Sequence, residues 1–296
     1  MDERIIFSDL KVAMRWPLRV FNLSGMGIHQ NAFIKKLAPT FQDLPWDEYD
    51  VRREQISLLH GAFPDEQRRL EMFNRDYYVG GCDTSDIADL IGMLSTEKKR
   101  EFDAIMPHRR RSLARFHVRK LSRQLWNVAR ISAGNYSQSQ GGDDFRIAAR
   151  IFQEMDRSVT EYAGFQKFLV RLGQMVEDIH HRPEYLEINA HQVTTVARRE
   201  KFGEGAPEGT HQDGMDYIVS ALVIERKHVH GGLSYVYGSD KTTPYLHITL
   251  RPGQGIFQTD IKSPFWHSVT PIRIDPNAGD DVVGERSILG FDIKIL

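Results

Sequence analysis

Two histidines and one aspartate are the residues whose types and spacing in this 296-residue sequence best suit chemistry. His211 and Asp213 lie two residues apart at the end of a segment rich in glycine and proline. If a strand begins here, the alternation of side chains places both on one face, where they can hold one ion. His267 follows 54 residues after Asp213, at the start of a predicted late strand. Two imidazoles and a carboxylate that leave adjacent coordination positions open are the facial triad of non-haem Fe(II) oxygenases.

A candidate carboxylate-binding residue, Arg286, opens the last predicted strand. Its planar guanidinium can hold a carboxylate at two points. If residues 276–281 turn a hairpin, Arg286 lies opposite Pro271, about 13 Å along the strand from His267. That distance suits a five-carbon diacid such as 2-oxoglutarate, bound to a metal at its other end. Arg273 shares the strand parity of His267 and is the alternative anchor.

The elements that must position these residues are predicted strands in the last third of the chain. After His181 the sequence consists of short segments rich in β-branched and aromatic residues, separated by turn signals such as Gly231-Gly232 and Pro252-Gly253. The seven segments are 185–197, 217–225, 233–238, 245–250, 255–259, 266–274 and 286–296. They predict an α+β protein with a double-stranded β-helix core, of the jelly-roll or cupin-like type, and helices packed on one outer face.

Helical patterns precede the predicted strands. Ser95 and Thr96 with Glu97 form a helix start signal. In residues 144–179, apolar side chains recur at intervals of three and four, which predicts one amphipathic helix or two with a break near Gly164. The predicted organisation is an N-terminal helical or mixed extension over 1–104 and a catalytic domain over 105–296. In that domain, helices occupy 105–180 and the jelly roll occupies 183–296.

Composition and charge exclude several function classes. Lys plus Arg is 39 and Asp plus Glu is 40, so the net charge is −1, and no global excess of positive charge indicates nucleic acid or an anionic membrane. A run without acids between Ala104 and Gly142 carries Arg109, Arg110 and Arg111; we expect a solvated face balanced by acids elsewhere. The single cysteine excludes an internal disulfide. No segment could span a bilayer, and we expect a cytoplasmic protein.

Several motifs together carry a resemblance to a known family. They are the runs Pro207–Gly214, His230–Ser234 and His267–Pro271, with Arg286. In these runs the sequence resembles the bacterial Fe(II)/2-oxoglutarate dioxygenases that hydroxylate free L-amino acids, of the isoleucine 4-hydroxylase and L-pipecolic acid hydroxylase type. The resemblance covers about residues 105–296. It implies Fe(II) bound by His211, Asp213 and His267, and the distal carboxylate of 2-oxoglutarate bound by Arg286.

The resemblance also implies a reaction and further site residues. An unactivated carbon of an aliphatic or cyclic free L-amino acid would be hydroxylated with O2, with release of succinate and CO2. His191 and Gln192 match a pocket-lining strand, Gln192 and Ser268 are further candidates for 2-oxoglutarate binding, and Trp266 could shape the pocket. The substrate carboxylate requires a cation, for which Arg198 and Arg146 are candidates. A loop over 202–209 could close over a small molecule.

Alternative functions remain open on the sequence alone. A cupin-like Zn or Mn hydrolase or isomerase would use the same triad without 2-oxoglutarate. An inactive barrel could serve as a binding module. His228 and His230 form a second pair with metal-ligand spacing, but no third ligand lies nearby in the sequence. The expected partner is a small-molecule substrate, with neither nucleic acid nor membrane, and a homodimer is compatible with the sequence.

Overall fold

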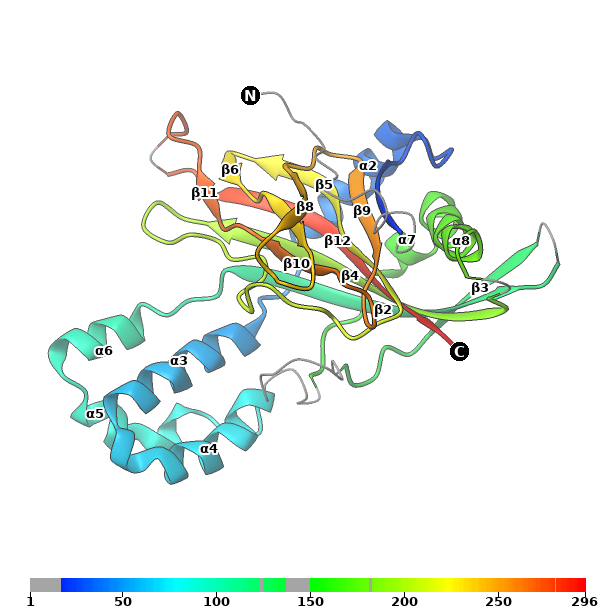
Figure 1. Ribbon diagram of the computed structural model, residues 1–296. Coiled ribbons are helices and arrows are strands. Elements are labelled where there is room, and N and C mark those ends of the chain that lie inside the picture. The colour runs from blue at the N-terminus through cyan, green and yellow to red at the C-terminus, as the bar shows by residue number, and fades with distance from the viewer. Residues whose placement is uncertain (1–16, 123–124, 137–149, 181–182, 280) are drawn as a thin grey trace.

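The computed structural model describes residues 17–122, 125–136, 150–180, 183–279 and 281–296 (Figure 1). Its helices are α2 (Gln30–Leu37), α3 (Glu48–Ala62), α4 (Gln67–Val79), α5 (Ala88–Met93), α6 (Thr96–Asp103), α7 (Arg157–Thr160) and α8 (Ala163–Glu177). Its strands are β1 (Leu18–Asn22), β2 (Arg109–Lys120), β3 (Trp126–Ile131), β4 (Tyr185–Ala197), β5 (Tyr217–Lys227), β6 (Val229–Gly231), β7 (Ser234–Tyr237), β8 (Pro244–Ile248), β9 (Gln254–Thr259), β10 (Trp266–Val269), β11 (Ile272–Ile274) and β12 (Gly284–Ile295). Of the helices described, none combines the length and apolar character that crossing a bilayer requires.

One large antiparallel sheet forms the centre of the molecule. Its strand order is β1-β9-β5-β12-β4-β2-β3. Two smaller sheets, β10-β7-β8 and β11-β6, accompany it, and Figure 1 shows their strands in front of β12 and β4. The prediction of a mixed helix and sheet protein built on antiparallel strands is confirmed.

Strand alternation divides the large sheet into two faces. On β4, Leu186, Ile188 and Ala190 join the main core against α2 and α8. Three residues of β4 with the opposite parity line a cavity on the other face of the sheet: His191, Val193 and Thr195. A second apolar cluster fills part of that face, where Val223 of β5 packs with Val236 of β7. The helices therefore cover one face of the sheet, and the small sheets enclose a cavity on the other.

The first 104 residues do more than extend the fold. β1 pairs with β9 at the edge of the large sheet, and Phe33 and Leu37 of α2 are buried in the main core. Helices α3 to α6 share a separate apolar cluster that includes Leu59 and Leu90, and they extend away from the sheet (Figure 1). The helix predicted at Ser95 is present as α6, with Ser95 Oγ accepting a hydrogen bond from the backbone N–H of Lys98.

The prediction that helices fill residues 105–180 is wrong over 109–131, where β2 and β3 form an antiparallel pair. In β2 the apolar Phe116 and Val118 alternate with polar side chains, which is a strand period. The amphipathic pattern of 144–179 becomes α7 and α8, separated near the predicted break. Residues 144–149 lie outside the described residues, and 150–156 are not helical.

Two further expectations about the late strands are wrong. The predicted strand 266–274 is divided into β10 and β11, because Pro271 lacks the N–H that would continue the ladder. No hairpin joins β11 to β12. Instead β11 pairs with β6, and β12 pairs with β4 and β5, which places Arg286 opposite Thr195 and Arg226.

Candidate active site

Backbone contacts place the loop that carries His211 and Asp213 beside β10. His211 and His267 exchange two backbone hydrogen bonds of 2.9 Å. The side-chain amide of Gln212 donates to the carbonyls of Asp260, Ser263 and Phe265. Asp260, which is fully buried, accepts from the backbone N–H of Asp213 and of Met215. The two segments predicted to meet are therefore adjacent, although His211 forms an isolated bridge and β5 begins only at Tyr217.

The side chains of His211, Asp213 and His267 converge. One potential ligand atom from each lies within 4.8 Å of the others. Both His211 Nε2 and His267 Nε2 lie 3.4 Å from an oxygen of Asp213, each from a different one. His211 Nδ1 is 2.9 Å from the carbonyl of Gly209, which can only accept. The Nδ1–H therefore donates to this carbonyl, and Nε2 is the ring nitrogen that faces Asp213.

The electrostatics of this cluster favour an ionised carboxylate. Burial alone would raise the pKa of Asp213, but His267 and His211 outweigh it and hold that pKa well below its usual value. Burial and the charge of Asp213 together raise the pKa of Asp260 to about 6. Asp213 is thus ready to bind a cation without first losing a proton.

The donor set fits a divalent first-row metal. Two imidazoles and one carboxylate are ligands that such ions accept, and they occupy one side of the ion. His267 Nδ1 is buried without a hydrogen-bond partner among the described residues. Within the part of the chain that the structure describes, this is the one group of three such side chains. His228 and His230 form no second centre, since His230 is exposed and contacts Asp275.

Arg286 lines the same cavity as the triad. It is 3 % exposed, yet its Nε and Nη2 have no hydrogen-bond partner among the described residues. Burial and the nearby charge of Arg226 lower the pKa of Arg286 to about 9. A buried cation with free donors requires an anion. Gly232, with a φ of +66°, leaves room for this side chain, because a Cβ there would lie 2.9 Å from Arg286 Cδ.

Arg273, the alternative anchor, lies elsewhere. It is exposed, and its guanidinium carbon lies 4.2 Å from the ring centroid of Phe202. It is not among the residues that line the cavity. The geometry therefore favours Arg286 as the carboxylate-binding residue.

The cavity has a volume of about 140 Å³. Around Arg286 its wall includes the hydroxyls of Thr195, Ser234 and Ser268. Gly205, Ala206 and Glu208, from the loop predicted to close over a ligand, also line it. The cavity can thus hold a small molecule beside the triad.

A polar network forms the remaining wall, and sequence reasoning identified only His191 of its members. Arg111 Nη2 lies 3.0 Å from His191 Nδ1, and His191 Nε2 lies 2.9 Å from Asp292 Oδ2. The hydroxyl of Tyr136 donates to the same oxygen at 2.7 Å. The sequence pattern around these residues is not distinctive. Arg111 and Asp292 lie in strands where polar and apolar residues alternate, and Tyr136 follows β3 near apolar residues. An exposed strand face produces the same alternation.

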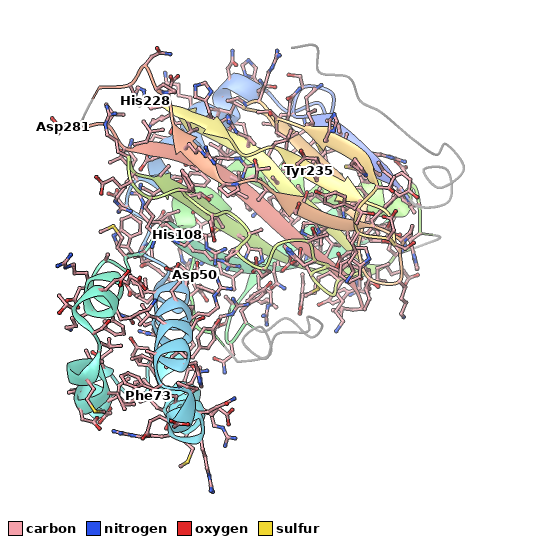
Figure 2. The ribbon with its side chains drawn as sticks, turned by 60° about the vertical axis from the view of Figure 1, so that its left-hand side comes forward. Asp50, Phe73, His108, His228, Tyr235 and Asp281 are labelled. Carbon is pink, nitrogen blue, oxygen red and sulfur yellow. The ribbon has the colours of Figure 1, made fainter. Side chains whose placement is uncertain are left out.

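Arg109, the first residue of β2, and helix α3 support this wall from outside. Arg109 is buried, with its Nη2 2.7 Å from Asp50 of α3 and its Nη1 3.2 Å from the carbonyl of Gly205. Figure 2 shows Asp50 and His108 where α3 meets the large sheet, while Phe73 lies at the far end of the helical segment. The expectation of a solvated basic face is thus wrong for Arg109 and Arg111, whose charges face acids and the cavity instead of water.

Three other predicted residues that the structure describes lie outside the cavity wall, and a fourth is not among the described residues. Gln192 is buried on the helix-covered face of β4, where it bonds Ser112 and Thr40, because it alternates with His191. Trp266 alternates with His267 and packs under Lys241. Arg198 donates to the carbonyl of Pro107 and lies over Trp46. Arg146 lies outside the described residues.

Comparisons with known proteins agree with this geometry. The family model described as 2OG-Fe dioxygenase matches residues 98–291. No curated protein sequence gives a significant match. The fold is similar to that of a BsmA homologue from Methylobium petroleophilum PM1, with a TM-score of 0.65 and 16% identity, over 97% of this chain and 92% of that one.

Two further solved structures are similar. IDO from Bacillus thuringiensis gives a TM-score of 0.51 and 17% identity over 64% of this chain and 75% of that one. The Fe(II)/(alpha)ketoglutarate-dependent dioxygenase TqaL gives 0.47 and 16% over 82% and 89%. The family match spans well over half of the chain and includes every residue of the triad and Arg286. The chain therefore belongs to the 2OG-Fe dioxygenase family, whose members are oxidoreductases that use Fe(II), 2-oxoglutarate and O2.

Proposed function

We propose that this dioxygenase hydroxylates an unactivated carbon of a small substrate, with His211, Asp213 and His267 as its iron ligands and Arg286 as the anchor of 2-oxoglutarate. The observation that carries the proposal is one cavity that holds both halves of the required site. It contains a convergent two-histidine, one-carboxylate cluster and a buried guanidinium with unpartnered donors.

Fe(II), 2-oxoglutarate and O2 supply the oxidising chemistry when bound. The residues of this chain bind and orient. Arg286 receives the distal carboxylate through the donors that are unpartnered here. Thr195 and Ser268 line the same cavity as Arg286 and the triad. The surrounding apolar side chains, such as Val193 and Ile288, keep the reacting atoms away from bulk water.

The proposed substrate is a free L-amino acid with an aliphatic or cyclic side chain. The motif runs around His211 and His267 support it, because they resemble those of amino-acid hydroxylases. The cavity wall supports it as well, since it presents the cation Arg111 and the acid Asp292 within one hydrogen-bonded network. A small zwitterion requires groups of both signs.

Two alternatives have less support. A Zn or Mn hydrolase would not explain the unpartnered donors of Arg286, and the family match favours 2-oxoglutarate chemistry. A nucleic-acid-binding barrel would need an exposed basic surface, whereas Arg109 and Arg111 are turned inward. No observation favours either function.

The test is turnover by the purified protein with Fe(II), 2-oxoglutarate and ascorbate in air. We expect succinate to form, and to form faster with one member of a panel of free amino acids that includes isoleucine, leucine and pipecolate. Mass spectrometry of that amino acid should show a gain of one oxygen. Succinate without oxygen gain by any panel member would contradict the amino-acid substrate. Absence of succinate under all conditions would contradict 2-oxoglutarate use.

A further inference from the structure

Asp292 is a buried carboxylate that faces the cavity, and no arginine or lysine of the described residues pairs with it. It is 6 % exposed and lies on β12, on the cavity face. Two hydrogen bonds from described residues arrive at its Oδ2, from the hydroxyl of Tyr136 and from His191 Nε2. Among the described residues, no ion pair joins Asp292 to a lysine or an arginine.

The histidine beside Asp292 is neutral. A guanidinium can only donate, so the 3.0 Å contact from Arg111 Nη2 makes His191 Nδ1 an acceptor. The single ring proton is then on Nε2, and it is donated to Asp292 Oδ2. Burial lowers the pKa of His191, and Arg111 acts in the same direction. The contact between His191 and Asp292 is therefore a hydrogen bond and not an ion pair.

Tyr136 is also a neutral donor. It is 2 % exposed, and burial together with the charge of Asp292 raises its pKa well above the usual value. The network thus fixes two neutral donors on Asp292 Oδ2, and neither of them brings a positive charge. An ionised carboxylate in a buried site is costly unless a positive charge faces it. Among the described cations near this end of the cavity, Arg109 pairs with Asp50, and Arg111 is directed at His191 with its Nη1 4.0 Å from Asp47. A ligand can therefore supply the charge that faces Asp292.

Besides Asp292 and Asp213 of the triad, a third acid lines the cavity, and it already faces a cation. Glu208 lies near Arg109, whose pKa it helps to raise. Arg111 has a buried Nε without a hydrogen-bond partner among the described residues, and it lines the same cavity. An anion-binding group and an uncompensated anion thus flank His191 on one wall.

From these contacts we propose that Asp292 binds the ammonium group of the substrate, and that Arg111 faces the substrate carboxylate beside it. This inference rests on the proposed function, since it identifies how that site would select an α-amino acid. His191 is a positioning residue that separates the two charges and holds each in place. Selection follows from charge: an α-hydroxy acid of the same shape lacks the cation that Asp292 requires.

The experiment measures binding, not turnover, by titration calorimetry on the full chain with Co(II) and 2-oxoglutarate in the absence of O2. The probes are L-isoleucine, L-leucine and L-pipecolate, together with the 2-hydroxy acid analogues of the first two. Asp292→Asn removes the charge and keeps the size. Tyr136→Phe removes one hydrogen bond and keeps the charge, and Glu208→Gln removes the charge of the remaining cavity acid that is not part of the triad.

We expect wild type to bind at least one amino acid more tightly than its hydroxy acid. Asp292→Asn should weaken the binding of that amino acid by roughly thirty-fold or more. The affinity for the hydroxy acid should change by less than about three-fold. Tyr136→Phe and Glu208→Gln should each weaken amino-acid binding less than Asp292→Asn does. Equal binding of the amino acid by wild type and Asp292→Asn, or a larger loss in Glu208→Gln, would overturn the assignment.

Two further outcomes separate this inference from the proposed function. If Asp292→Asn does not fold, as judged by circular dichroism, the wild-type comparison still decides, because equal binding of amino and hydroxy acids would overturn the role of Asp292. If wild type binds none of the amino acids but forms succinate, the inference fails and the use of 2-oxoglutarate stands. If amino-acid binding depends on Asp292 and no succinate forms, the proposed function fails and the inference stands.

Discussion

Arg286 and Asp292 lie on the same strand, β12, and both face the same cavity with opposite charges. They are six residues apart, so they share strand parity and are separated by about 20 Å along the strand. The triad approaches this strand from the loop at His211 and from β10. One strand thus presents a cation at one end of the cavity and a carboxylate at the other, and neither pairs with an opposite charge among the described residues. This arrangement suits two ligands that bind on either side of a metal.

The first prediction concerns the cation. Arg286→Ala should raise the 2-oxoglutarate concentration needed for half-maximal succinate formation by roughly thirty-fold or more, because a buried carboxylate loses a charge-assisted partner worth about 2–5 kcal/mol. Arg286→Lys should restore only part of the affinity, since an ammonium cannot reproduce the planar fork. Arg273→Ala is the matched control, because Arg273 is exposed. A larger defect in that control would show that Arg273 is the anchor.

The second prediction uses the glycine behind Arg286. Gly232→Ala places a methyl group 2.9 Å from Arg286 Cδ at a φ of +66°, so Arg286 must move and the backbone is strained. We expect weaker 2-oxoglutarate binding with little change in metal binding. Gly134→Ala also has a positive φ, of +52°, but meets no atom within 4 Å and lies outside the residues that line the cavity, so it controls for backbone strain alone. Indistinguishable 2-oxoglutarate affinities for the two variants would contradict the contact.

The third prediction concerns the metal. His211→Ala, Asp213→Ala and His267→Ala should each lower Fe(II) binding, measured as iron retained after anaerobic gel filtration. They should also abolish the weak visible absorption that Fe(II) and 2-oxoglutarate produce together. Asp213→Ala should be the most damaging, because it removes negative charge as well as a ligand. His230→Ala changes an exposed histidine and should bind iron normally; an iron loss confined to that variant would place the metal elsewhere.

The triad could be predicted from sequence because its signal is local. His211 and Asp213 are two residues apart, and each candidate strand is marked by its own turns. The pairing of the strands was harder to predict from the sequence. The hairpin expected at 276–281 would have placed β12 beside β11, whereas β12 instead inserts between β4 and β5. Such long-range pairing depends on which faces bury apolar area together, and a single segment does not contain that information.

The substrate wall was missed for a different reason. In β12, Asp292 lies between the buried Phe291 and Ile293, and in β2, Arg111 precedes Leu113 at the spacing of one strand face. An alternating strand predicts that its polar face meets water. A face that lines a cavity has the same pattern. Only the presence of β10 and the loop at Gly205 over that face distinguishes the two cases.

The fourth prediction compares two arginine–aspartate pairs with the same 2.7 Å separation. Arg109 and Asp50 are buried, whereas Arg69 and Asp89 are exposed. Arg109→Ala removes the cation that pairs with Asp50 and the nearer of the two that face Asp47. We expect the free energy of unfolding to fall by about 3–5 kcal/mol in urea denaturation. Arg69→Ala should leave that free energy nearly unchanged, because water screens the exposed pair. Equal losses in both variants would show that burial does not determine the cost.

The last prediction is a pH dependence of stability that originates in His108. This residue is 2 % exposed, and neither ring nitrogen has a hydrogen-bond partner among the described residues. Burial, with the nearby charges of Arg109 and Lys201, lowers its pKa from 6.5 to about 4. Between these values the unfolded chain binds a proton that the folded protein does not. Stability from this group is therefore complete above pH 6.5 and is lost as the pH falls to about 4, by about 3 kcal/mol in total.

Asp50 acts in the opposite direction, since its raised pKa of about 6 lets the folded protein bind a proton first. The pH dependence of wild-type stability is thus the sum of both effects. The difference in unfolding free energy between wild type and a His108 variant isolates the contribution of His108. His108→Gln places a group that does not titrate at the same position, so any cost of the substitution is independent of pH. Unfolding free energies from urea titrations at pH 7.5, 6, 5 and 4.5 should show wild type losing stability relative to His108→Gln as the pH falls. Parallel profiles for the two proteins would mean that His108 titrates normally in the folded state, and hence that its surroundings admit water.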